Sequence, residues 1–169
     1  MRDLLNAAEM KAVDQRSIEE YGIPSLVLME RAALEVVKRA RELLEPGLSG
    51  NEALEHGPGR ERLLKERKRK TVWAVCGLGN NGADGAAAAR MLTLQGFSSV
   101  ILLPSLEGKR SRELEVQLSI AEKLGIPILT LGDPLPEACD LILDAVFGIG
   151  LSRPVEASAQ TQGLSWAAP

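Results

Sequence analysis

Apolar residues are arranged in two different ways along the chain. Over roughly the first 45 residues they recur every three or four positions, which predicts two amphipathic helices. The first helix is expected to end near Tyr21, and Asn6 and Glu9 have the spacing of a capping box at its start. The second and longer helix is expected to end before Pro46-Gly47.

From Thr71 onward, short apolar runs alternate with helical patterns. The predicted strands cover residues 71–76, 99–103, 128–130 and 141–146, and the predicted helices cover residues 85–95 and 111–124. Strands that alternate with helices form right-handed βαβ units and a parallel sheet. The predicted fold class is therefore α/β, a Rossmann-like three-layer domain with a parallel sheet, preceded by two N-terminal helices.

Composition narrows the class of protein. A chain of 169 residues with 45% hydrophobic content is typical of one globular domain, and a net charge of −3 argues against a general nucleic-acid binder. The basic run 60–70 contains interleaved glutamates, which favours a solvated helix end over a phosphate-binding patch. No apolar run approaches the ~20 residues of a membrane span, and we expect a cytoplasmic protein. Cys76 and Cys139 lack C-x-x-C spacing and are expected to be small buried hydrophobes.

The run Val75–Gly85 carries the first candidate chemistry. It places four glycines between a predicted strand and a predicted helix whose N-cap is expected near Asp84. Backbone N–H groups and the helix dipole at such a turn favour an anionic group such as a pyrophosphate. A glycine-rich turn that merely packs closely is the alternative. A dehydrogenase would need a carboxylate at the end of the second strand, where this chain has Pro104-Ser105.

Polar groups follow two of the predicted strands at their carboxyl ends. Asn80 and Asn81 offer amide oxygens after the first strand, and Asp144 closes the apolar run of the last one. Ligands of open parallel sheets bind at this edge, so Asp144 is interpreted as a ligand for a hard cation together with Asn81, or as a general base. A loop-bracing role is the alternative for Asp144. Gly148 would let the backbone approach a ligand, and Arg153 suits phosphate.

Three segments together resemble a known family. Residues 79–85, Gly-Asn-Asn-Gly-Ala-Asp-Gly, resemble the G-N-N-G-G-D-G signature of the YjeF N-terminal domain family, the NAD(P)H-hydrate epimerases. Residues 140–154 resemble the family's D-A-x-F-G-x-G-L-x-R-P segment, and residues 9–14 and 22–33 resemble its opening helices. The resemblance covers roughly residues 4–155.

The resemblance implies an activity and a set of site residues. The family interconverts the R and S forms of hydrated NADH or NADPH, so that a partner dehydratase can restore the cofactor. Asn81 and Asp144 would bind a potassium ion, Asp144 is the best candidate for the acid/base group with Lys109 as a weaker one, and a homodimer is possible. The implied substrate-binding residues are Asn80, Asn81, Gly82, Ala83, Asp84, Gly148, Ile149, Gly150, Leu151, Ser152, Arg153 and Pro154.

The chain also departs from the family pattern. Ala33 and Ala83 stand where the family has glycine, and a positive φ at Ala83 would strain the turn. Family members continue beyond the R-P segment, so we expect an incomplete domain over residues 1–155, an unmatched tail over 156–169, an open sheet edge and low turnover. The alternatives are a non-catalytic nucleotide-binding or dimerisation module of the same fold, and another Rossmann-type nucleotide-dependent enzyme.

Overall fold

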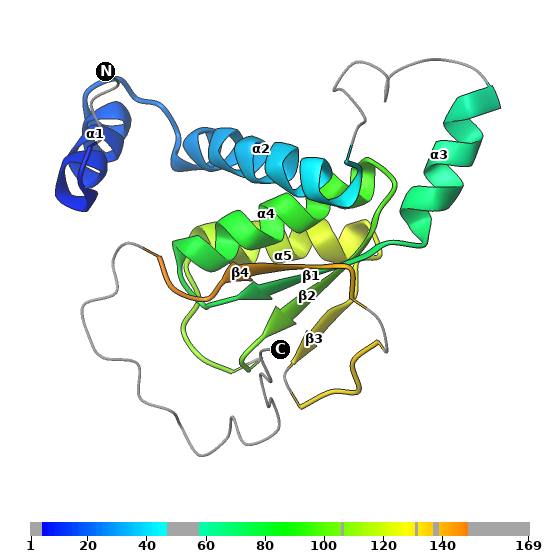
Figure 1. Ribbon diagram of the computed structural model, residues 1–169. Coiled ribbons are helices and arrows are strands. Elements are labelled where there is room, and N and C mark those ends of the chain that lie inside the picture. The colour runs from blue at the N-terminus through cyan, green and yellow to red at the C-terminus, as the bar shows by residue number, and fades with distance from the viewer. Residues whose placement is uncertain (1–4, 47–57, 106, 131, 137–138, 149–169) are drawn as a thin grey trace.

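The computed structural model describes residues 5–46, 58–105, 107–130, 132–136 and 139–148 (Figure 1). Its helices are α1 (Ala7–Glu19), α2 (Ser25–Leu44), α3 (Pro58–Lys68), α4 (Asn80–Leu94) and α5 (Arg112–Lys123). Its strands are β1 (Thr71–Cys76), β2 (Ser98–Leu103), β3 (Ile128–Thr130) and β4 (Leu141–Ala145). The capping box at the start of α1 is confirmed, since the Asn6 side chain accepts from the backbone of Glu9 while the Glu9 carboxylate accepts from the backbone of Asn6.

The four strands form one parallel sheet in the order β3-β2-β1-β4. In its register Val75 is the partner of Asp144, and Cys76 is the partner of Ala145. The carboxyl ends of β1 and β4 therefore meet at one edge of the sheet. The predicted α/β fold class is confirmed.

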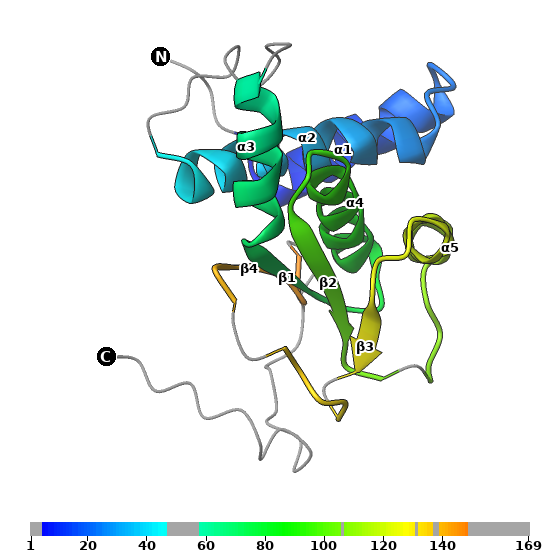
Figure 2. The same ribbon diagram turned by 90° about the vertical axis from the view of Figure 1, so that its right-hand side faces the viewer.

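The layers are a sheet, a pair of helices and an outer helix (Figures 1 and 2). Helices α4 and α5 lie over the sheet, and α2 lies across α4 on the side away from the strands. Buried residues 86–89 of α4 are all alanine. They belong to two buried clusters, and each cluster joins α4 to both the sheet and α2. Small side chains on both sides let the sheet and α2 approach the same helix closely.

Helix α4 begins earlier than the sequence predicts. It starts at Asn80 with Gly79 as its N-cap, and that N-cap makes no side-chain hydrogen bond. The expectation that Asp84 is near the N-cap is wrong, because Asp84 lies in the second turn of the helix. The physical reason is close packing: Gly82 lies against the Gly77 carbonyl, which lets the helix begin directly after the turn that follows β1.

A buried ion pair ties α3 to α2. Arg67 Nε donates to Glu45 Oε1 at 2.6 Å and its second terminal nitrogen donates to Glu45 Oε2 at 2.8 Å. The guanidinium also donates to the Gln95 carbonyl at 3.1 Å and lies 5.3 Å from the centroid of the Phe97 ring. The basic run therefore supplies a structural contact through Arg67, while Lys65 and Lys68 are exposed.

The two cysteines are free thiols. Cys76 is buried, and burial raises its pKa to about 12. Cys139 is half-buried and lies beside the Leu141 carbonyl. In the part of the chain that the structure describes, every helix is too short or too polar to cross a membrane.

Candidate functional site

The glycine-rich turn between β1 and α4 is built by close packing. A Cβ added at Gly77 would overlap the Val146 carbonyl, and one at Gly82 would overlap the Gly77 carbonyl. A Cβ at Gly85 would overlap the Ala145 side chain and lie 3.0 Å from the Cys76 sulfur. None of these glycines has a positive φ. The need for glycine at these places therefore comes from the close approach of β1, α4 and β4, as the packing interpretation predicts.

The amino end of α4 opens at the carboxyl edge of this sheet. Helix geometry leaves the N–H groups of Asn80, Asn81 and Gly82 without intrahelical partners, and the helix dipole adds partial positive charge. The neighbouring Leu78 carbonyl accepts from the Ser111 N–H at 2.9 Å, which holds the N-cap of α5 beside the turn. This edge can therefore accept an anionic group at the amino end of α4.

The loop after β4 lies against Asn81. A Cβ added at Gly148 would lie 3.2 Å from the Asn81 Cβ and 3.3 Å from its Oδ1. Asp144 is exposed, and its Oδ1 accepts from the Val146 N–H at 3.1 Å, which braces the start of the same loop. Both side chains carry oxygen donors at this edge, a donor type that suits a hard cation such as potassium. Their sharing of one ion stays a prediction.

The remaining predicted residues of this site differ in their placement. The predicted residues Ile149, Gly150, Leu151, Ser152, Arg153 and Pro154 lie outside the described residues. Ala83 is fully buried in α4 and packs in the core, so its side chain faces no ligand. Lys109 is exposed. Among the described residues no group of three or more His, Cys, Asp and Glu side chains is placed to hold a metal ion.

A cavity of about 290 Å³ adjoins the amino end of α4. We call it the acidic cleft, because three carboxyl groups line it from three helices: Asp14 of α1, Asp84 of α4 and Glu113 of α5. Its other lining residues are Met10, Ile18, Ser25, Leu28, Met29, Ala32 and Asn80. The cleft therefore combines apolar walls with a few polar groups, a composition typical of small-molecule sites.

The carboxyl groups of the acidic cleft have different environments. The Ser25 hydroxyl donates to Glu113 Oε1 at 2.7 Å, and this hydrogen bond lowers the pKa of Glu113. Burial raises the pKa of Asp84 to about 6, with a second contribution from the negative charge of Asp14. At neutral pH Glu113 is therefore ionised, whereas Asp84 can still take up a proton.

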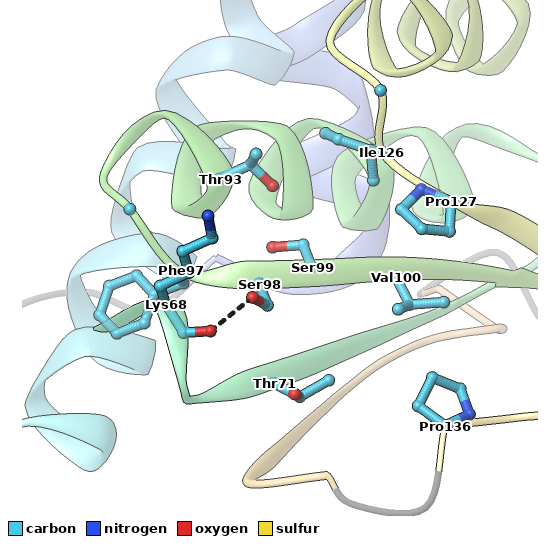
Figure 3. A pocket seen from close by; sticks show the side chains of 12 residues that line it. Lys68, Thr71, Thr93, Phe97, Ser98, Ser99, Val100, Ile126, Pro127 and Pro136 are labelled. Carbon is cyan, nitrogen blue, oxygen red and sulfur yellow. Dashed lines mark hydrogen bonds between the residues drawn. The ribbon is translucent and has the colours of Figure 1, made fainter. Parts of the chain in front are cut away.

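A larger cavity lies at the opposite edge of the sheet (Figure 3). Its volume is about 490 Å³, and it opens among residues at the amino ends of β1 and β2 and before β3. The Ser98 hydroxyl donates to the Lys68 carbonyl at 2.7 Å, and the Ser99 hydroxyl is buried without a partner in the described structure. This cavity is separated from the glycine-rich turn by the length of the strands.

Sequence reasoning did not select the residues that face Asp84. Asp14 and Ser25 are part of the family resemblance but were not expected in the site, and Glu113 was not singled out. Met10, Asp14 and Ile18 are spaced four residues apart, which places them on one face of a helix. This spacing indicates that the three residues share one face of α1, but it does not indicate which other element that face packs against.

Comparison with known proteins gives consistent matches. The model of the family described as YjeF-related protein N-terminus matches residues 25–167. A protein of Limosilactobacillus fermentum named NAD(P)H-hydrate epimerase is 39% identical over 158 residues, which cover 93% of this chain and 64% of that protein. One of Oenococcus oeni with the same name is 43% identical over 144 residues, covering 84% and 57% of the two chains. The chain thus spans about 60% of the length of these relatives.

The fold also matches a solved structure. The crystal structure of yeast ynu0 superposes with a TM-score of 0.67 at 23% sequence identity, and the match covers 91% of this chain and 60% of that one. This likeness supports the arrangement of the sheet and its helices.

Proposed function

The chain belongs to the family of YjeF-related protein N-termini, and on that premise we propose that it is an NAD(P)H-hydrate epimerase. It would interconvert the R and S forms of hydrated NADH or NADPH. In this proposal a dehydratase acts on one of the two forms, so that the pair of enzymes repairs the damaged cofactor. The cytoplasmic location expected from the sequence stays a prediction, and so does the possible homodimer.

The packing of the loop after β4 against the amino end of α4 is the observation that supports this proposal most. A Cβ added at Gly148 would lie 3.2 Å from the Asn81 Cβ, so the two strand ends come close together, and in this proposal their residues face one crevice. The free N–H groups of Asn80 to Gly82 would bind the nucleotide phosphates. The substrate-binding roles of Gly148 and of residues 149–154 belong to the same proposal.

Asn81 and Asp144 would hold a potassium ion at this crevice. Both offer uncharged or anionic oxygen atoms, the donors that such an ion prefers. When bound, the ion would supply a fixed positive charge beside the negatively charged nucleotide. Asp144 is also the acid/base candidate from the sequence, although its carboxylate already accepts the Val146 N–H.

An epimerase assay tests the proposal. The chain is mixed with R-hydrated NADPH, and formation of the S form is followed with and without potassium. We expect conversion above the uncatalysed rate, stimulated by potassium, and loss of that stimulation in Asn81→Ala. Glu115→Gln on the exposed face of α5 is the control, and it should keep full activity.

Two other outcomes would contradict the proposal in different ways. Binding of hydrated NADPH without conversion would indicate the non-catalytic nucleotide-binding module. If the chain neither binds nor converts hydrated NADPH, both the epimerase and the non-catalytic binding module are excluded for this chain.

A further inference from the structure

Two carboxyl groups of the acidic cleft, those of Glu113 and Asp84, have different environments. Glu113 accepts a hydrogen bond from the Ser25 hydroxyl and is held ionised, while Asp84 is half-buried and accepts no hydrogen bond from the described residues. Environments that push the pKa values of neighbouring carboxyl groups apart are typical of sites where one group transfers a proton and another stays charged. The cleft thus contains a group suited to acid–base chemistry near neutral pH.

The position of Asp84 connects the cleft to the proposed substrate site. Asn80 and Asp84 are four residues apart on α4 and line the same cleft. Asn80 also stands at the amino end of this helix, where the nucleotide phosphates would bind. On the other side of the turn, Asn81 contacts the loop that follows β4. A nucleotide held at the amino end of α4 can therefore extend one end into the cleft.

We infer that Asp84 transfers the proton in the proposed epimerisation, and that Asp14, facing it from α1, sets the pH range in which Asp84 can do so. This inference rests on the proposed function and assigns the acid/base role to Asp84, which leaves Asp144 as a cation ligand. Asp14 acts here as a positioning residue, since it works through Asp84.

The proposed step balances without any further reactant. Protonated Asp84 gives its proton to the hydroxyl on the hydrated ring, the C–O bond breaks, and water leaves with the bonding electrons. The lone pair of the adjacent ring nitrogen stabilises the resulting cation. Water then adds to the opposite face, and the Asp84 carboxylate takes back one proton, so that no net oxidation or reduction occurs.

Three other helices line the acidic cleft around Asp84. α1 presents the negative charge of Asp14 and the apolar Met10 and Ile18, and α5 presents the ionised Glu113. α2 presents only Ser25 and apolar residues among its cleft-lining positions. Burial is the largest cause of the raised pKa of Asp84, and the Asp14 charge is the second.

The pH dependence of the epimerase tests the inference. After the uncatalysed reaction has been subtracted, kcat/KM of the unsubstituted chain should fall as the pH rises through about 6. Asp84→Asn should lower kcat by at least about 100-fold with little change in KM, the usual size of a lost proton transfer. Asp14→Asn should move the fall in kcat/KM to lower pH and so reduce activity at neutral pH. Glu115→Gln, which removes an exposed carboxylate from the same helix as Glu113, should leave the profile unchanged.

A second measurement keeps the inference separate from the proposed function. Carboxyl-carbon NMR should show Asp84 titrating near pH 6, and near a lower value in Asp14→Asn. An active chain whose Asp84→Asn variant keeps its kcat would overturn the inference and leave the epimerase proposal standing. A chain with no conversion would overturn the proposed function and this role with it. Titration of Asp84 near pH 4 would overturn the inference alone.

Discussion

The expected effect of the Ala83 methyl group depends on the backbone conformation of this residue. The sequence raises the possibility of a positive φ here, but the described residues with positive φ are all glycines. Ala83 lies in α4, is fully buried and packs with Ala74 and Cys76. The condition under which glycine would relieve strain at this position is therefore not met.

We predict that Ala83→Gly destabilises the protein. Glycine costs about 1 kcal/mol relative to alanine in a helix, and loss of a buried methyl adds about 0.8 kcal/mol. Urea unfolding should show a decrease of about 2 kcal/mol in the free energy of unfolding, and calorimetric titration should show no gain in affinity for hydrated NADPH. A more stable or tighter-binding variant would contradict the helical assignment of this residue.

Asp84 gives a second prediction at the same scale, on stability against pH. Its pKa rises from an ordinary 3.8 to about 6 on folding, so between these values the folded state binds more protons than the unfolded state. Stability contributed by this group therefore falls as the pH rises from about 4 to about 6. Asp84→Asn removes the penalty and should stabilise the protein at pH 7.5 by about 1 kcal/mol, a figure reduced because solvent reaches the half-buried group.

Unfolding by urea at two pH values checks this sign. The gain from Asp84→Asn should be present at pH 7.5 and largely absent at pH 4, where the unsubstituted carboxyl is protonated. A variant that is more stable yet inactive would fit a site in which a buried carboxyl is kept for function. Equal stability of the two forms at both pH values would mean that burial of Asp84 costs nothing.

At the scale of elements, the sequence predicts the strands better than the helix that borders the site. Val72, Ala74 and Cys76 are buried on one face of β1, and the sequence predicts this strand from a short, continuous apolar run. The start of α4 depends instead on the fit of Gly82 beneath the Gly77 carbonyl, a contact between two backbones. Such a contact leaves no periodic signal, and polar Asn80 and Asn81 are more typical of a loop.

The burial of the ion pair Arg67–Glu45 is another feature of the helices that the composition of the basic run does not predict. Both side chains are 5% exposed, whereas the pair Arg62–Glu66 on the same helix is 84% and 55% exposed. Arg67→Met should lower the free energy of unfolding by about 3–5 kcal/mol, because the buried Glu45 carboxylate loses both of its short hydrogen bonds and keeps only Arg41 Nε at 3.8 Å. Arg62→Met is the matched control and should change it by less than about 1 kcal/mol.

Chemical unfolding of three variants distinguishes the causes. If Arg67→Met combined with Glu45→Met recovers most of the loss, the cost lies in the unpaired charge and not in the missing packing. Similar small effects for Arg67→Met and Arg62→Met would contradict a buried pair.

Across the whole molecule, the candidate site divides into a part that is local in sequence and a part that is not. The proposed substrate site at residues 79–85 and 144–148 follows from two motifs and from the rule that parallel strands present their carboxyl ends at one edge. The acidic cleft joins Asp14, Asp84 and Glu113, which are far apart in the chain. These three residues come together only because α1 turns back toward α4 at Gly22, whose φ is +66°. A glycine at this position predicts a turn but does not predict the direction in which α1 lies.

The same arrangement predicts that stability is unevenly distributed over the molecule. No residue of α1 is buried, whereas most of α4 is buried between the sheet and α2. A helix of 13 residues held by its capping box and the exposed pair Arg16–Glu20 is marginal by itself, so α1 should open without unfolding the core. Because α1 forms one wall of the acidic cleft, such opening would also expose Asp84.

Hydrogen exchange tests this distribution. Backbone amides of α1 should exchange orders of magnitude faster than those of β1 and α4, and the second half of α2 should resemble α4 because Val37, Ala40 and Leu44 are buried. Addition of hydrated NADPH should slow exchange in α1, since a ligand in the cleft would contact Met10, Asp14 and Ile18, which line it. Asp84→Asn should also slow α1 at pH 7.5, because it removes a charge that repels Asp14. Exchange in α1 as slow as in α4 would mean that this helix belongs to the cooperative core, and the cleft would then be a fixed cavity with no movable wall.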